Sequence, residues 1–87
     1  MDYELLVAWP VVELLKSLPM RERRRLRECL MWIIRDPSGR SDYQERDAVG
    51  RSVEIHVCAW YAFKYWIDHT DRHIKLLDVY PADRPRS

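Results

Sequence analysis

The carboxyl-terminal part of the chain most constrains the fold, because it contains three short segments in which apolar and polar residues alternate. The segments are Ser52–Cys58, Tyr61–Asp68 and His73–Tyr80. Alternation with a period of two is typical of a β-strand with one buried face. Only short connections separate the segments, so they predict a three-stranded antiparallel meander.

The alternation also predicts which side chains share a face of this sheet. The polar positions of the first two segments would place Glu54 and His56 beside Lys64, on the face that the core does not use. The third segment breaks the alternation at Leu76 and Leu77, which indicates an internal strand covered on both faces. We expect the buried face to consist of Val53, Ile55, Val57, Tyr61, Phe63, Tyr65 and Ile67.

The amino-terminal half predicts one strand and two helices. Tyr3–Ala8 is short and apolar, as expected for a first strand, and Pro10–Leu18 has apolar residues at helical spacing. Met20–Arg35 predicts a second helix, and the polar segment Ser38–Gly50 predicts a loop. The expected fold is α+β: a strand, a helical hairpin and a meander, with both helices on one sheet face. The apolar stripe of the second helix is Leu26, Cys29, Leu30, Ile33 and Ile34.

Length and composition predict one small globular domain. The 87 residues suffice for a single core over 1–87, and Pro81–Ser87 is expected to form a flexible tail. Apolar residues at 47% and charged residues at 33% are ordinary for a soluble protein. The chain has no apolar run of about 20 residues and no signal-peptide pattern, so no membrane partner is expected.

The two cysteines and three histidines predict neither a cofactor nor a metal site. Cys29 and Cys58 lack the CxxC spacing of zinc sites and are expected to be reduced thiols in a cytoplasmic protein. His56, His69 and His73 have no helical or paired-cysteine context that would make them metal ligands.

Positive charge is concentrated in the second predicted helix and the residues after it. Residues 21–40 contain seven basic and three acidic residues, a local net charge of +4 in a chain of net charge +1. Arg21, Arg24 and Arg25 could contact nucleic-acid phosphates or an acidic partner protein. The alternative is a solvated helix face.

The predicted exposed face carries groups suited to RNA cleavage. Attack of a 2′-hydroxyl on the adjacent phosphate needs a base, an acid and positive charge. Glu54 and His56 would project about 6.5–7 Å apart on one strand, with Lys64 on the next strand neutralising charge. Trp66 shares this predicted face and could stack on a base. The alternatives are ordinary cross-strand pairs for the charged residues and packing for the tryptophan.

The element order and the strand motifs together resemble a known toxin superfamily. The motifs are Arg35-Asp36-Pro37 after the helical hairpin, Arg51–Val57, Tyr61–Asp68 and Ile74–Val79. Over nearly the whole chain they are similar to the RelE/ParE superfamily of bacterial toxins from type II toxin–antitoxin systems.

The resemblance implies one of two activities. RelE-like members cut messenger RNA in the ribosomal A site with a basic and acid/base cluster on the exposed sheet face. ParE-like members poison DNA gyrase and need no such cluster. Both kinds are held inactive by an antitoxin that wraps around them.

The chain departs from the RelE pattern at the positions that matter for cleavage. Glu54 and His56 stand where RelE carries two lysines. Ala62 stands in place of an arginine, with Lys64 two residues further on, and Arg84 lies near the position of a late arginine. The strictly RelE-like site is therefore absent.

Taken with these residues, the resemblance implies that the chain is the toxin of a toxin–antitoxin pair and acts as a metal-independent, ribosome-dependent endoribonuclease. Its expected partners are an antitoxin, the ribosome and messenger RNA, with a homodimer or a toxin–antitoxin hetero-oligomer as the assembly. The alternatives are a gyrase poison without catalytic residues and a non-toxic relative that binds an antitoxin. The expected catalytic residues are Glu54, His56 and Lys64, and the expected nucleic-acid contacts are Arg21, Arg24, Arg25, Arg51, Trp66, Arg72 and Arg84.

Overall fold

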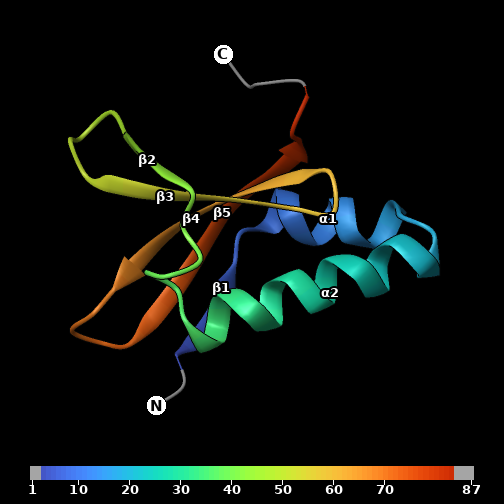
Figure 1. Ribbon diagram of the computed structural model, residues 1–87, viewed down its shortest axis with the longest axis horizontal. Helices are drawn as coiled ribbons and strands as arrows, with labels where there is room; N and C mark the ends of the chain where they lie inside the picture. The colour runs from blue at the N-terminus through green and yellow to red at the C-terminus, as the bar shows by residue number, and fades with distance from the viewer. Residues whose placement is uncertain (1–2, 84–87) are drawn as a thin grey trace.

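The computed structural model describes residues 3–83, which form two helices and five strands (Figure 1). The predicted α+β class is confirmed. The elements in chain order are β1 (Glu4–Val7), α1 (Trp9–Ser17), α2 (Met20–Arg35), β2 (Tyr43–Arg46), β3 (Ser52–Cys58), β4 (Tyr61–Asp68) and β5 (His73–Pro81).

The strands form one mixed sheet in the order β1-β5-β4-β3-β2. β3, β4 and β5 make the predicted antiparallel meander, and β1 pairs in parallel with β5. β5 is therefore an internal strand, as predicted. The prediction of an unbroken loop over Ser38–Gly50 is wrong at Tyr43–Arg46, which pairs with β3 as an edge strand. A four-residue strand whose side chains are all exposed carries no apolar alternation, so the sequence pattern did not reveal it.

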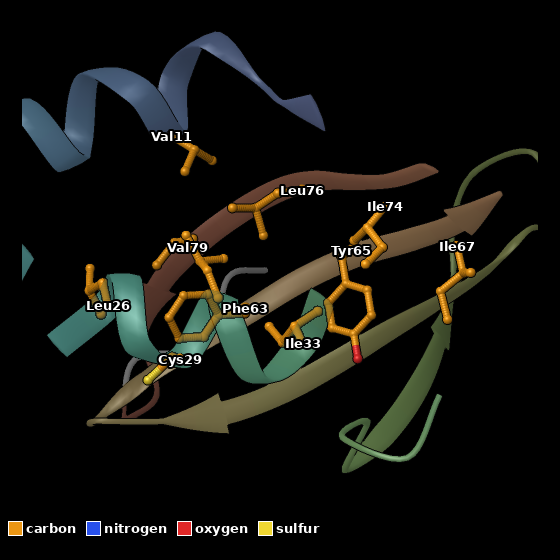
Figure 2. Close-up of a cluster of buried hydrophobic side chains, with 11 residues drawn as sticks. Val11, Leu26, Cys29, Ile33, Phe63, Tyr65, Ile67, Ile74, Leu76 and Val79 are labelled. Carbon is orange, nitrogen blue, oxygen red and sulfur yellow. The ribbon is translucent and has the colours of Figure 1, made fainter. Parts of the chain in front are cut away.

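Both helices pack on the same face of the sheet, and the main core lies between them and β4 and β5 (Figure 2). The predicted apolar stripe of α2 supplies its share of this core, with Leu26, Cys29, Leu30 and Ile33 all buried. Val11 is the buried residue of α1. The sheet contributes Phe63, Tyr65, Ile67, Ile74, Leu76 and Val79.

A disulfide joins Cys29 of α2 to Cys58 at the end of β3, with a Cα–Cα distance of 6.1 Å. The prediction of two reduced thiols is wrong. It relied on spacing along the chain, whereas packing of α2 against the sheet brings together two cysteines that are 29 positions apart. The bond shows that Cys58 points toward the helices.

The turn between β3 and β4 has only two residues, Ala59 and Trp60. Both adopt positive φ angles, 54° and 70°, as the tight turns that match the twist of a hairpin require. The turn pairs Cys58 directly with Tyr61. Because paired residues share a face, this one pair determines which residues of β3 and β4 lie together.

The break in alternation at Leu76 and Leu77 marks an irregularity in the pairing of β4 with β5. Lys64 pairs with Asp78 and Tyr65 pairs with Leu76, so Leu77 is an extra residue in β5. An extra residue of this kind reverses which alternate positions of the strand face the core, so the pattern differs before and after Leu77. The pattern reflects this bulge, and only Leu76 of the two leucines is fully buried.

The start of the predicted tail belongs to the folded domain. Pro81 is the last residue of β5, and the Ala82 N–H donates to the Trp60 carbonyl oxygen at 2.9 Å. The rest of the predicted tail, from residue 84 onward, lies outside the described residues. Neither of the two helices in the described range is long and apolar enough to cross a membrane.

Candidate nucleic-acid interface

The pairing of β3 with β4 places Glu54 and His56 on the sheet face that the helices cover. Glu54 pairs with Tyr65, a core residue, and His56 lies two positions further along the same strand. Lys64 pairs with Ile55 and therefore points to the opposite face. The prediction that Glu54, His56 and Lys64 share one surface is wrong, because the apolar positions of β3 and β4 face opposite sides of the sheet.

Glu54 belongs to a packed polar cluster beneath the loop that follows α2. Its side chain is buried, and the Gln44 Nε2 amide donates to both carboxylate oxygens, at 3.2 and 2.8 Å. The neighbouring Tyr65 hydroxyl donates to the Pro37 carbonyl oxygen at 2.5 Å. Burial raises the pKa of Tyr65 far above its usual value, and the charge of Glu54 adds to this effect. These contacts give Glu54 a structural role.

His56 is also held away from solvent. Its side chain is 12% exposed, and its ring lies 6.4 Å from the Phe63 ring. Nδ1 is 3.3 Å from an Asp42 carboxylate oxygen without hydrogen-bond geometry. That oxygen accepts the Val57 backbone N–H at 2.6 Å. The imidazole therefore packs at the margin of the core instead of facing a substrate.

We call the sheet surface opposite the two helices the open face. Both helices of the described chain lie on the other side (Figure 1). A second, smaller apolar cluster of Ile55, Ala62 and Tyr80 forms its floor. Among the polar and aromatic side chains that the strand register places on this face are Tyr43, Glu45, Lys64, Trp66, Lys75 and Asp78.

Trp66 lies on the open face between two cations. The Arg51 guanidinium is 4.9 Å and the Lys75 ammonium 4.7 Å from the centre of its ring. Arg51 is also held by Asp47, whose carboxylate accepts from Nε at 2.7 Å. That ion pair lowers the pKa of Asp47 below its usual value. Arg51 and Trp66 were both predicted to contact nucleic acid, and the structure brings them together.

Lys75 was missed because the irregularity at Leu77 obscured the facing of β5. Its pairing with Trp66 follows once the extra residue is recognised. The sequence did contain a signal for Lys75. The alternation is intact from Ile74 to Leu76, and it places the Lys75 side chain on the sheet face that points away from the core.

A second polar group on the open face surrounds Lys64. Its ammonium lies 3.9 Å from Oε1 of Glu45, and Tyr43 stands two positions before Glu45 with half of its surface exposed. Burial raises the pKa of Tyr80, and the neighbouring Tyr43, Glu45 and Asp78 add to this effect. A cation, a carboxylate and two phenols are therefore close together. Tyr43 and Glu45 were missed because β2 was predicted as loop.

The remaining predicted phosphate contacts do not join the open face. Arg21, Arg24 and Arg25 are exposed on α2, on the other side of the sheet (Figure 1). The Arg72 guanidinium lies 5.0 Å from the centre of the Tyr3 ring, at the turn between β4 and β5. Arg84 lies outside the described residues.

Among the residues that the structure describes, one group of side chains has donor atoms close enough to hold a metal ion. Asp68, Asp71 and His73 offer ligand atoms within 4.8 Å of one another at the β4–β5 turn. Other contacts already engage them: Asp68 accepts the Asp71 N–H, and His73 Nε2 is 3.6 Å from a Glu4 carboxylate oxygen. Surface acidic groups of this kind are common without a bound ion, and we assign this one no function.

Comparison with known proteins identifies the class of fold. No family model matches the chain, and no curated protein matches it. Two solved structures share its architecture, so the chain has a RelE-like toxin fold. One is an archaeal RelE, solved in complex with RelB from Pyrococcus horikoshii, with a TM-score of 0.78 and 25% identity over 98% of this chain and 100% of that one. The other is a mutant of the E. coli toxin RelE in its free state, with a TM-score of 0.70 and 15% identity over 95% of this chain and 86% of that one.

Proposed function

We propose that this chain is the toxin of a toxin–antitoxin pair and that it cleaves messenger RNA on the ribosome through its open face. The observation that carries the proposal is the arrangement of Arg51, Trp66 and Lys75 beside Lys64 on the uncovered side of a RelE-like sheet. The archaeal RelE is bound to RelB, which supports an antitoxin as the partner of this chain.

The aromatic part of the open face suits a single-stranded RNA. Stacking of a base on a tryptophan contributes about 1–3 kcal/mol and tolerates any base. Arg51 and Lys75 lie beside the Trp66 ring at 4.9 and 4.7 Å, where they can also bind the adjacent phosphates. We assign Trp66 to the stacking of a base and its two cationic neighbours to the RNA backbone.

The polar group around Lys64 suits cleavage by an internal 2′-hydroxyl. In this reaction the 2′-oxygen attacks the adjacent phosphorus, a 2′,3′-cyclic phosphate forms, and the 5′-oxygen leaves with a proton. Tyr43 and Glu45 are two positions apart on β2, a separation of about 6.5–7 Å that straddles a phosphodiester. We assign Glu45 to accept the 2′-proton, Tyr43 to protonate the leaving oxygen and Lys64 to neutralise the phosphorane.

These assignments replace Glu54 and His56, which the sequence suggested for proton transfer. Neither side chain lies on the open face, and Glu54 is engaged by Gln44 through both carboxylate oxygens. No metal or cofactor is needed for the proposed reaction.

The proposal is tested by induced expression of the chain with separate readouts of translation and of messenger RNA ends. We expect wild-type chain to arrest translation and to leave new RNA ends within coding sequence. The variant Glu45→Gln should lower the cleavage rate by about 10²–10⁴-fold, the usual contribution of a positioned base. Lys64→Ala should lower it by about 10²–10³-fold, the usual effect of removing a group that stabilises transition-state charge.

Glu54→Gln is the matched control, because it makes the same chemical change on the other sheet face. It should cleave RNA at the wild-type rate while circular dichroism shows all variants folded. Unchanged cleavage in both Glu45→Gln and Lys64→Ala would exclude the assigned site.

Poisoning of DNA gyrase without any catalytic residue is the second candidate. It is favoured by one observation: Glu54 and His56 occupy the places of two basic residues in RelE and are turned toward the core. Induced expression would then relax plasmid supercoiling or trigger a DNA-damage response, and messenger RNA would stay intact.

A further inference from the structure

We infer that the Cys29–Cys58 disulfide is a redox switch that a dithiol reductant opens in the folded chain, and that opening it shortens the lifetime of the fold. The bond joins α2 to the end of β3 on the helix-covered face of the sheet. The inference therefore concerns how long the folded chain persists, and it goes beyond the proposed cleavage of RNA.

The two cysteines of the disulfide differ in their access to solvent. Cys29 is 2% exposed and belongs to the buried cluster of Figure 2, whereas Cys58 is only half-buried. Both line a groove of about 310 Å³ between α2 and the β3–β4 turn. A reductant that enters this groove therefore meets Cys58 before Cys29. Exposed disulfides of this kind are the ones that thiols reduce most readily.

The side chains around the groove suit an incoming thiolate. Trp32 and Trp60 line it and are 46% and 83% exposed, so they offer apolar surface to the body of the reductant. Arg25 also lines the groove, one turn before Cys29 on α2. Among residues 3–83, Arg25 forms no ion pair.

The charges that line the groove act on the reaction in opposite directions. The Arg25 guanidinium attracts the incoming thiolate and stabilises the thiolate that leaves Cys29. The carboxylate of Glu28 also lines the groove and repels both. Replacing either side chain should therefore change the rate of reduction, and the two changes should have opposite signs.

The reduction proceeds by two exchanges. A thiolate of the reductant bonds to Sγ of Cys58, the bond between the two cysteines breaks, and Cys29 leaves as a thiolate. The second thiol of the reductant then displaces Cys58 and closes a disulfide within the reductant. The chain gains two electrons, and its two thiolates take up the two protons that the dithiol gives up.

Opening the bond affects a turn whose backbone is strained. Ala59 and Trp60, next to Cys58, adopt φ angles of 54° and 70°, and neither is glycine. Such a conformation persists only where surrounding contacts hold it. The bond from Cys58 to α2 and the hydrogen bond from the Ala82 N–H to the Trp60 carbonyl oxygen hold this turn on either side. Reduction removes the covalent attachment, so the end of the hairpin should separate from α2 more often.

The loss matters because the domain is small. The disulfide closes a loop of about 30 residues, and removing a crosslink over such a loop raises the equilibrium constant of unfolding by roughly 100-fold or more. Proteases cut the open form, so the rate of digestion rises with its population. The redox state of the two cysteines therefore sets the lifetime of the folded chain.

The proposed function supplies the setting in which such a switch would operate, and this step alone rests on that function. A toxin that cleaves messenger RNA on the ribosome works among the thiols of the cytosol. Disulfides are rare there, and those that occur are usually catalytic or redox-sensing. Oxidising conditions would prolong the life of the folded toxin, and recovery of the thiol pool would shorten it.

The test treats the purified, folded, full-length chain with dithiothreitol without denaturant and follows free thiols by alkylation and mass spectrometry. We expect both cysteines to become reduced while circular dichroism still shows the fold. A nonspecific protease should then digest the reduced chain about 100-fold faster than the oxidised chain. A disulfide that reacts only after denaturant is added, or a reduced chain digested as slowly as the oxidised one, would overturn the inference.

Two kinds of variant control this experiment. Cys29→Ala/Cys58→Ala should be digested as fast as the reduced chain and should not respond to dithiothreitol. Arg25→Gln should slow the reduction about 5-fold, and Glu28→Gln should accelerate it. Arg24→Gln is the matched control, because Arg24 is on the same helix and outside this groove, and it should be reduced at the wild-type rate. Equal rates in all three charge variants would overturn the assignment of the groove as the route of attack.

Failure of this inference is distinguishable from failure of the proposed function. Reduction and digestion are measured on the purified chain without RNA. A chain whose disulfide opens as expected but which never cleaves messenger RNA keeps the switch and loses the proposed function. A chain that cleaves RNA and whose disulfide resists dithiothreitol keeps the proposed function and loses the switch.

Discussion

The two faces of the sheet differ in what they bury and in what they leave accessible. Beneath the helices, Phe63 and Tyr65 are fully buried and Cys58 is bonded to α2. On the open face, only a small apolar cluster lies beneath charged and aromatic side chains, and Trp66 stands between two cations. The comparison shows that a single strand can supply side chains both to the core and to the candidate site. β4 contributes Phe63 and Tyr65 to the core and Lys64 and Trp66 to the open face.

The largest effect expected from this difference follows truncation of an aromatic residue on the helix-covered face. Phe63→Ala should lower the free energy of unfolding by about 3–5 kcal/mol, because it removes a fully buried side chain and leaves a cavity. Trp66→Ala on the open face should cost about 1 kcal/mol, close to the value of its contacts with the two cations. Urea denaturation measures both, and similar losses would mean that the two faces are equally important for stability.

The assignment of residues to these faces was the main error of the sequence-based prediction, although the chain contained the information to avoid it. The alternation alone predicts that the apolar positions of β3 and of β4 share the core face. A two-residue turn pairs Cys58 with Tyr61, which puts the even positions of β3 with the odd positions of β4. The connection Ala59-Trp60 lacks the glycine or asparagine usual in such turns, so its type was not recognised.

Other features followed from local pattern with less ambiguity. The core stripe of α2 and the antiparallel meander were predicted because helical periodicity and strand alternation are local properties. The disulfide depends on contact between two residues that are 29 positions apart. β2 left no trace in the sequence pattern because its four side chains are all exposed and show no apolar alternation. For the same reason Glu45 and Tyr43 were absent from the predicted site, whereas Arg51, Lys64 and Trp66 were in it.

The disulfide provides the next test, because it links the sheet to α2 on the helix-covered face and does not contact the open face. It closes a loop of about 30 residues between α2 and β3, and a loop of this length is expected to stabilise the fold by roughly 3–4 kcal/mol. Cys29→Ala/Cys58→Ala should lower the free energy of unfolding by about that amount. Titration of the wild-type chain with a thiol reagent under denaturing conditions should detect no free thiol before reduction.

The same variant sharpens the comparison through its effect on the open face. Because Cys58 points away from Lys64 and Trp66, RNA binding below the unfolding midpoint should be unchanged in Cys29→Ala/Cys58→Ala. Free thiols in the wild-type chain would contradict the bond itself, and loss of RNA binding in the folded variant would show that the two faces are coupled.

The smallest expected effect distinguishes the faces through two tyrosines with raised pKa values. The pKa of Tyr65 rises mainly through burial under the helices, and the pKa of Tyr80 rises through burial on the open face. At neutral pH both are protonated in the folded and the unfolded chain. Tyr65→Phe should then cost only about 0.5–1.5 kcal/mol, the net value of its hydrogen bond to Pro37.

Alkaline pH separates the two tyrosines by the sign of the linkage. A tyrosine in the unfolded chain loses its proton near pH 10, whereas a folded tyrosine of raised pKa still holds it. Stability should therefore fall as the pH rises above 10, by up to about 1.4 kcal/mol per pH unit for each such group. Tyr65→Phe should flatten this decline more than Tyr80→Phe does, because Tyr65 is fully buried and the open-face tyrosine keeps 7% of its surface exposed. Urea midpoints measured between pH 8 and pH 11 provide the comparison. A Tyr65→Phe curve parallel to that of the wild type above pH 10 would mean that the helix-covered face admits water to its core hydroxyl.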